Sequence, residues 1–211
     1  MLDTKTRNMV AERLSAIEAP VRITMFTQET ECAHCGEARE MVQDVCSLSD
    51  RVSLRVLDFV EDGKEAERLK VDKIPATLVH GEREYGVRFF GVPSGYELDA
   101  LLDAIVSVSR GRGRVEFPEE VLEVLEKLRE PVHIQVFTAP TCPNCPEMVK
   151  LAHRLAVASE HITSDMIDVL EFPYYLQRYS IWGVPKTVIN EKLEFVGRAD
   201  VLDVVKKLEM L

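Results

Sequence analysis

Apolar residues along the chain follow two kinds of spacing, and these predict helices and strands in a fixed order. Spacings of three and four residues, which place side chains on one face of a helix, follow positions 35 and 145. Short apolar runs, typical of strands, lie at 21–27, 52–59, 77–80, 87–90, 132–138, 162–169, 187–189 and 193–196. Each half is predicted to run helix, strand, helix, strand, helix, strand, strand, helix. This order favours an α/β sheet with parallel pairs and a closing antiparallel hairpin.

The second half of the sequence repeats the first. Four landmarks pair in the same order: 21–27 with 132–138, CAHC at 32–35 with CPNC at 142–145, Asp58 with Asp168, and Ile74-Pro75 with Val184-Pro185. Because an internal repeat determines the whole fold, the duplication predicts two units. Residues 1–111 carry the first motif and residues 112–211 carry the second. The arginine-rich stretch 109–114 is predicted to be a solvated linker.

Composition and charge narrow the class of protein. The 211 residues include 46% hydrophobic and 29% charged side chains, as in globular proteins. A formal net charge of −10 argues against general binding to nucleic acid or to anionic membranes. Charged residues near the N-terminus, and the absence of any apolar run close to the ~18 residues of a membrane span, predict a cytoplasmic protein. Cysteines in that compartment are normally reduced, so their spacing is more informative than their number.

Both CxxC motifs lie where a predicted strand passes into a predicted helix. The first turn of a helix offers unpaired N–H groups and a partial positive charge, which stabilise a thiolate. We therefore predict that Cys32 and Cys142 are the nucleophiles. Cys35 and Cys145 follow three residues later, within disulfide reach, and are predicted to resolve the mixed disulfide. The fifth cysteine, Cys46, is predicted to be a small buried side chain.

A metal site is the competing interpretation of the same cysteines. Two CxxC pairs can supply four thiolates to zinc or to an iron–sulfur cluster. Pairs that share a zinc ion are typically about 15–20 residues apart, whereas these motifs lie in different halves of the chain. A redox role without metal or other cofactor is therefore favoured. A metal-binding or purely structural tandem adaptor is the alternative of a different class.

The strand, the CxxC motif, the helix and the later Ile/Val-Pro-x-Thr segment together resemble the thioredoxin/glutaredoxin superfamily. Two such units in one chain are similar to the glutaredoxin-like protein disulfide oxidoreductases of thermophiles. The resemblance implies two tandem thioredoxin-like units, each a central mixed sheet flanked by helices. It implies an enzyme that reduces, forms or isomerises the disulfides of protein substrates. It also implies that Pro75 and Pro185 are cis, and that Ile74 and Val184 pair with the substrate backbone.

A second resemblance concerns the second half of the chain. Residues 141–146 and 182–185 are similar to the N-terminal redox domain of alkyl hydroperoxide reductase flavoproteins. This implies an alternative function, electron transfer between a thioredoxin-reductase-like flavoprotein and a peroxiredoxin. Asparagine and glutamine together number seven in 211 residues, which fits the depletion of heat-labile amides in thermophiles.

His34 is predicted to modulate the first motif. An imidazolium between the two cysteines would stabilise the thiolate and make the disulfide more oxidising. The nearby Glu29, Glu31 and Glu37 would act in the opposite direction. We expect the histidine to dominate, because the glutamate side chains can turn into water, where screening is strong.

The resemblance also shows a departure. Thioredoxin itself keeps a buried aspartate six residues before its first cysteine, whereas this chain has Phe26 and Val136 there. Another acid or a water molecule must then move the proton. Asp58 and Asp168, at the ends of predicted strands, are candidates, although an aspartate at a strand end more often stabilises a turn.

Overall fold

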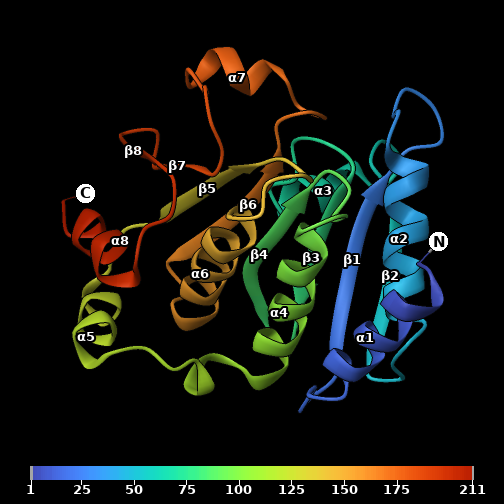
Figure 1. Ribbon diagram of the computed structural model, residues 1–211, viewed down its shortest axis with the longest axis horizontal. Coiled ribbons are helices and arrows are strands. Elements are labelled where there is room, and N and C mark those ends of the chain that lie inside the picture. The colour runs from blue at the N-terminus through green and yellow to red at the C-terminus, as the bar shows by residue number, and fades with distance from the viewer. Residues whose placement is uncertain (1, 211) are drawn as a thin grey trace.

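The computed structural model describes residues 2–210 and has the predicted order of elements in both halves (Figure 1). The first half contains α1 (Thr4–Leu14), β1 (Val21–Thr27), α2 (Cys35–Cys46), β2 (Val52–Asp58), α3 (Gly63–Arg68), β3 (Ala76–His80), β4 (Glu84–Phe90) and α4 (Glu97–Arg110). After a 3-10 turn, η1 (Arg112–Arg114), the second half contains α5 (Glu119–Lys127), β5 (Val132–Thr138), α6 (Cys145–Ala158), β6 (Ile162–Asp168), α7 (Tyr174–Arg178), β7 (Lys186–Ile189), β8 (Leu193–Val196) and α8 (Val201–Leu208).

All of these strands belong to one mixed sheet, in the order β2-β1-β3-β4-β6-β5-β7-β8. The pairs β1–β2 and β5–β6 are parallel, and β3–β4 and β7–β8 are antiparallel hairpins, as predicted. The sequence pattern did not predict the parallel pairing of β4 with β6, which runs from Val87–Ser164 to Phe90–Ile167. We call this pairing the seam. It joins the two halves into one continuous sheet.

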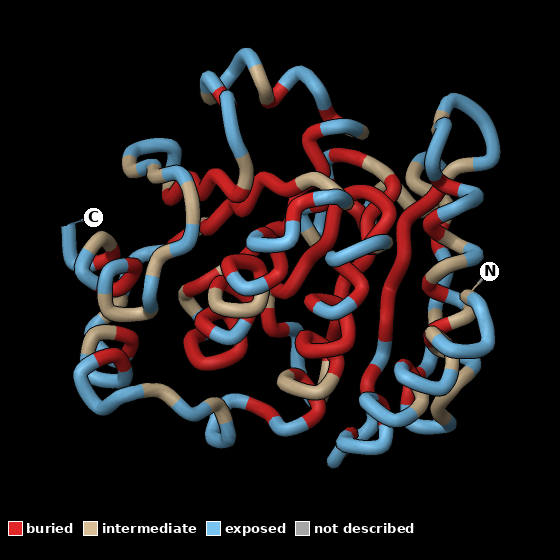
Figure 2. Tube along the Cα trace, viewed as in Figure 1, coloured by how far each residue is buried: buried red, intermediate tan, exposed pale blue. Residues whose placement is uncertain are grey.

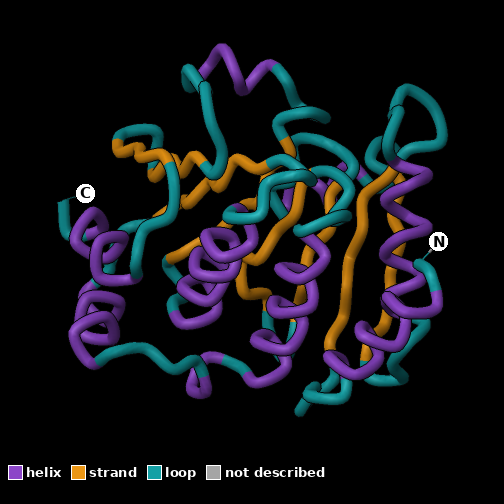
Figure 3. Tube along the Cα trace, in the orientation of Figure 1, coloured by secondary structure: helices purple, strands orange, loops and turns teal. Residues whose placement is uncertain are grey.

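Helices cover the two faces of the sheet unequally, and the alternation of side chains along each strand explains how. On β4, Val87 and Phe89 point into a core formed with α1, α2, α4, α5, α6 and α8. Phe90 points into a smaller core on the opposite face, which α3 and α7 cover. The strands are the most deeply buried part of the molecule (Figure 2), and the helices lie outside them (Figure 3).

An ion pair is buried within the seam. Arg88 of β4 donates from Nε and Nη2 to the two carboxylate oxygens of Asp165 on β6, at 2.6 and 2.9 Å. Arg88 also donates to the backbone oxygen of Lys70 at 2.8 Å, and His133 Nε2 lies 2.6 Å from Asp165 Oδ2. The two partners are 8% and 1% exposed, so this pair is shielded from water.

The linker between the halves is exposed, as predicted, but it is not free. Arg110 is the last residue of α4, and Gly111 follows with φ 77°. Arg112 is exposed, yet its Nε donates to the backbone oxygen of Ala158 at the end of α6, at 2.9 Å. The linker is therefore attached to the second half. Within residues 2–210, no helix is long and apolar enough to cross a membrane.

Candidate active site

Each CxxC motif lies at the carboxyl end of a central strand, where the chain turns into a helix. Cys35 is the first residue of α2, which follows β1, and Cys145 is the first residue of α6, which follows β5. Neither helix has a side chain that caps its first turn, so the backbone N–H groups there face the motif. We call Cys32, Cys35, Ile74 and Pro75 site one, and Cys142, Cys145, Val184 and Pro185 site two.

Both motifs are closed as disulfides. Cys32 is bonded to Cys35 and Cys142 to Cys145, with 5.5 Å between the Cα atoms in each pair. The second cysteine of each pair is almost completely buried, at 1% and 0% exposure, whereas Cys142 is 9% exposed and Cys32 is half-buried. A partner molecule can therefore reach the first cysteine of each pair more easily than the second.

The two sites are too far apart to share one metal ion. Four steps between neighbouring strands separate β1 from β5 in the sheet, which at ~4.8 Å each amounts to about 19 Å. A zinc–thiolate bond is only about 2.3 Å long, so the four cysteines cannot surround a common ion in this fold. In the part of the chain that the structure describes, no group of three or more histidine, cysteine or acidic side chains has the arrangement of a metal site.

The two prolines of the repeated Ile/Val-Pro segment adopt the geometry that the resemblance implies. The peptide bonds Ile74–Pro75 and Val184–Pro185 are both cis. In site two, Cys142 Sγ lies 3.6 Å from the backbone oxygen of Val184. Each proline oxygen accepts a hydrogen bond from a glycine of the neighbouring strand end, Pro75 from Gly91 at 3.0 Å and Pro185 from Gly197 at 2.7 Å. The segment before β3 or β7 is thus held beside its disulfide.

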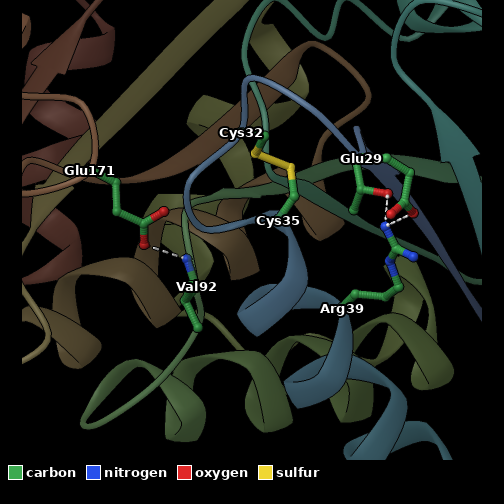
Figure 4. Close-up of a disulfide and its surroundings, with 7 residues drawn as sticks. Glu29, Cys32, Cys35, Arg39, Val92 and Glu171 are labelled. Carbon is green, nitrogen blue, oxygen red and sulfur yellow. Dashed lines mark hydrogen bonds and ion pairs between the residues drawn. A yellow bond between two sulfur atoms is a disulfide. The ribbon is translucent and has the colours of Figure 1, made fainter.

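The charges around site one differ from the sequence-based picture. Glu29 does not act alone, because Arg39 of α2 binds its carboxylate at 2.7 Å. Figure 4 shows this pair on one side of the Cys32–Cys35 disulfide and Glu171, a residue of the second half, on the other. Arg39 thus partly compensates one of the three glutamates expected to oppose His34.

The two strand-end aspartates stabilise turns, the role that we favoured. Asp58 Oδ1 accepts from the backbone nitrogens of Val60 and Glu61 at 2.9 and 3.0 Å. Asp168 Oδ1 accepts from the backbone nitrogen of Leu170 at 2.8 Å. Asp168 is also 1% exposed, and this burial raises the pKa of its carboxyl group.

Two buried acids near the junction of the halves escaped the sequence analysis. Glu97, in the first turn of α4, is 1% exposed and has no hydrogen-bond partner among the described residues for either carboxylate oxygen. Burial, reinforced by the charge of Asp168, raises the pKa of Glu97 to about 8. Burial also raises the pKa of Glu171. An acid at the start of a helix normally faces water, so the sequence contained no signal that Glu97 is buried.

Cys46 lies at the end of α2, away from both disulfides, and carries a free thiol. Burial raises the pKa of this thiol to about 12. It therefore stays protonated near neutral pH and is a poor nucleophile, in agreement with the packing role predicted for it.

Known proteins share this arrangement of sheet and motifs. Residues 132–209 match the family model described as "Thioredoxin domain". The crystal structure of a protein disulfide oxidoreductase from Aeropyrum pernix K1 is similar with a TM-score of 0.90 and 26% identity, over 99% of this chain and 94% of that one. The chain has the thioredoxin fold.

Further similarities of this thioredoxin-fold chain extend over its whole length. The NTD_N/C domain of the alkylhydroperoxide reductase AhpF from Enterococcus faecalis (V583) has a TM-score of 0.90 at 19% identity, covering 99% of this chain and 100% of that one. The corresponding alkyl hydroperoxide reductase protein, AhpF, from Staphylococcus aureus (strain NCTC 8325 / PS 47) is 29% identical over 210 residues. A protein named NADH dehydrogenase from Bacillus subtilis (strain 168) is 23% identical over 210 residues. The chain spans 38% of the length of each of these two curated relatives.

The fold, the two closed CxxC motifs and these similarities together define the chemistry. Each disulfide lies at a helix start, with an accessible first sulfur and a buried second sulfur. The chain is a thioredoxin-like thiol–disulfide oxidoreductase with two CxxC sites.

Proposed function

We propose that this protein exchanges disulfides with protein substrates at both sites. The observation that carries the proposal is the geometry of site two, where Cys142 Sγ lies 3.6 Å from the oxygen of Val184, directly before cis-Pro185. An extended substrate strand that pairs with this backbone would bring its own sulfur next to Cys142. The repeated Ile74–Pro75 segment gives site one the same substrate-binding role.

The surroundings of site two suit a polypeptide. Four exposed apolar side chains lie on loops at the same end of the sheet as the disulfide: Trp182 (96% exposed), Leu170 (65%), Tyr174 (52%) and Tyr96 (52%). Monomeric proteins rarely expose apolar side chains in groups unless a partner covers them. At site one the repeat places Asp72 where site two has Trp182, and Lys64 where site two has Tyr174. The two sites therefore offer different surfaces to their substrates.

The proposed reaction has two steps, written here for site two. The Cys142 thiolate attacks one sulfur of the substrate disulfide, so that a mixed disulfide forms and one substrate sulfur leaves as a thiolate, which takes a proton from water. Cys145 then loses its proton and attacks Cys142, releasing the second substrate sulfur. The substrate gains two electrons and two protons, and the Cys142–Cys145 disulfide re-forms. The same steps in reverse form a disulfide in a dithiol substrate, and Cys32 and Cys35 play the equivalent roles in site one.

Two units, residues 1–111 and 112–211, are proposed to carry one site each. The boundary lies between Gly111, directly after α4, and η1, and each site takes its cysteines and its cis-proline from one unit.

Reduction of insulin disulfides, with dithiothreitol as the electron source, tests this function. Cys32→Ser should abolish turnover at site one and Cys142→Ser at site two, because only the thiolate at the helix start can begin exchange. The double variant should therefore be inactive, whereas each single variant keeps the activity of the other site. Full residual activity in the double variant would contradict the mechanism.

A second function is electron transfer from a flavoprotein reductase to a peroxiredoxin. The similarity to the alkyl hydroperoxide reductase protein AhpF over 99% of this chain favours it. The test is peroxide consumption in a mixture of NADPH, a thioredoxin-reductase-like flavoprotein, this protein and a peroxiredoxin. Consumption that needs this protein, and that stops in the double cysteine variant, would support the role. Equal rates with and without this protein would contradict it.

A further inference from the structure

The loop that follows β4 closes site one on the side of the seam. Gly91 donates its N–H to the oxygen of cis-Pro75 at 3.0 Å, so this loop fixes the segment that is proposed to bind substrate. Gly91 has φ 106°, and a Cβ atom there would lie 2.9 Å from Asp168 Cβ and 2.9 Å from Glu171 Oε1. Only glycine fits this position comfortably, because the second half of the chain packs directly against it.

Glu171 is the residue of the second half that contacts this loop. It lies between β6 and α7, and its Oε1 accepts a hydrogen bond from the backbone nitrogen of Val92 at 2.6 Å. Its Oε2 is buried and has no partner among the described residues. Figure 4 shows Glu171 reaching the Val92 backbone beside the Cys32–Cys35 disulfide. A carboxyl group of one half is therefore bound to the loop that shapes the site of the other half.

The repeat provides an internal comparison. Glu61 follows Asp58 by three residues, as Glu171 follows Asp168, and so it occupies the equivalent position in the first half. Glu61 is exposed, and no described residue donates a hydrogen bond to its carboxylate. The loop after β8 likewise has no such neighbour, since a Cβ atom on Gly197 would meet nothing within 4 Å. Strand β8 is at the edge of the sheet, whereas β4 is inside it, next to β6.

The charges that face Glu171 connect it with the first motif. Burial raises the pKa of Glu171, and the hydrogen bond from Val92 and the charge of His34 act against this effect. The charges of Asp168, at the end of β6, and of Glu37, on α2, raise it further. His34 and Glu37 both belong to the start of α2, where Cys35 lies, so Glu171 faces the motif of site one directly.

We propose that Glu171 is a positioning residue of site one, supplied by the second half of the chain. Its hydrogen bond to Val92 holds the loop at Gly91, and Gly91 in turn holds cis-Pro75 beside Cys32. Site one then needs the docked second half for its substrate-binding geometry, although all of its sulfur chemistry belongs to the first half. This inference rests on the proposed disulfide exchange at site one.

The test uses the full chain with site two disabled by Cys142→Ser and Cys145→Ser, and it measures insulin reduction by site one. Glu171→Ala removes the acceptor and should raise KM for the disulfide substrate by about tenfold, with a smaller change in kcat, as expected for the loss of a hydrogen bond to a charged group. Glu171→Gln keeps an oxygen that can accept from Val92 and should restore KM to within about twofold of the parent. The matched control is Glu61→Ala, which should leave KM of site one unchanged.

A chain with site one disabled instead, by Cys32→Ser and Cys35→Ser, shows whether the variant is folded. Glu171→Ala should leave the activity of its site two intact. An unchanged KM for site one in Glu171→Ala, or a Glu171→Gln variant as impaired as Glu171→Ala, would overturn the positioning role while the proposed function stands. If the parent chain with only site one has no activity at all, the proposed function of site one is wrong, and this inference is overturned with it.

Discussion

Replacing Arg88 by methionine should weaken the connection between the two halves of the sheet. The substitution keeps a long side chain in the seam but removes the charge and both hydrogen bonds to Asp165, at 2.6 and 2.9 Å. Asp165 remains 1% exposed, with His133 as its remaining side-chain partner. A buried carboxylate that loses its main counter-charge is destabilising, because water cannot reach it to compensate.

The size of the effect follows from this burial. Removing one partner of a buried pair typically costs about 3–5 kcal/mol of unfolding free energy. For a chain of about 200 residues, each kcal/mol corresponds to about 2–4 °C, so Tm should fall by about 6–20 °C. The double variant Arg88→Met with Asp165→Leu removes both charges and should recover most of this loss, since well-packed apolar side chains often replace a buried pair at little cost.

Denaturant unfolding of the wild type, the two single variants and the double variant gives the coupling energy between Arg88 and Asp165. The pH dependence is a second measurement. Burial alone would raise the pKa of Asp165, but Arg88 and His133 hold it well below its usual 3.8. A carboxylate whose pKa is lowered on folding stabilises the protein above its unfolded pKa, so the difference between wild type and Arg88→Met should shrink as the pH falls below about 4. An Arg88→Met variant as stable as the wild type at pH 7 would refute this account of the seam.

Three further predictions concern the sites and their surroundings. Glu97→Gln should stabilise the protein at pH 8 but not at pH 4: burial raises the pKa of Glu97 from 4.5 to about 8, so the unfolded chain loses this proton first and wild-type stability falls across that range; equal pH profiles of Tm for the variant and the wild type would contradict the buried neutral carboxyl. Cys35→Ser and Cys145→Ser should each trap partner proteins as mixed disulfides on non-reducing gels, because nothing resolves the first exchange; if neither variant gives a reducible adduct, these cysteines are not resolvers. His34→Ala should lower the reduction potential of site one, measured against a glutathione buffer with site two disabled; an unchanged or higher potential would show that the imidazole does not govern that site.

The local features of the fold were predictable from the sequence. Strand β1 and helix α2 are defined by their own hydrophobic spacing, and the motif between them marks where one ends and the other begins. The repeat made each of these predictions twice, which is why the order of elements is correct throughout. Boundaries were less accurate: Ile17 belongs to the apolar stripe of the first helix, but α1 ends at Leu14 and Ile17 is buried beyond it.

The pairing of the halves was decided by the tertiary structure. Arg88 and Asp165 are charged residues within strands, a pattern typical of a solvated face, yet they are buried because β4 and β6 meet at the seam. Glu97 and Glu171 have the sequence context of exposed acids, and they are buried because the other half of the chain covers them. Hydrophobic spacing reports only on neighbours within one helix or strand, whereas Arg88 and Asp165 are 77 residues apart in the sequence. The sequence by itself therefore determined the two CxxC motifs and the strands and helices that carry them. Only the packing of one half on the other determined which charged groups lose contact with water and lie beside the disulfides.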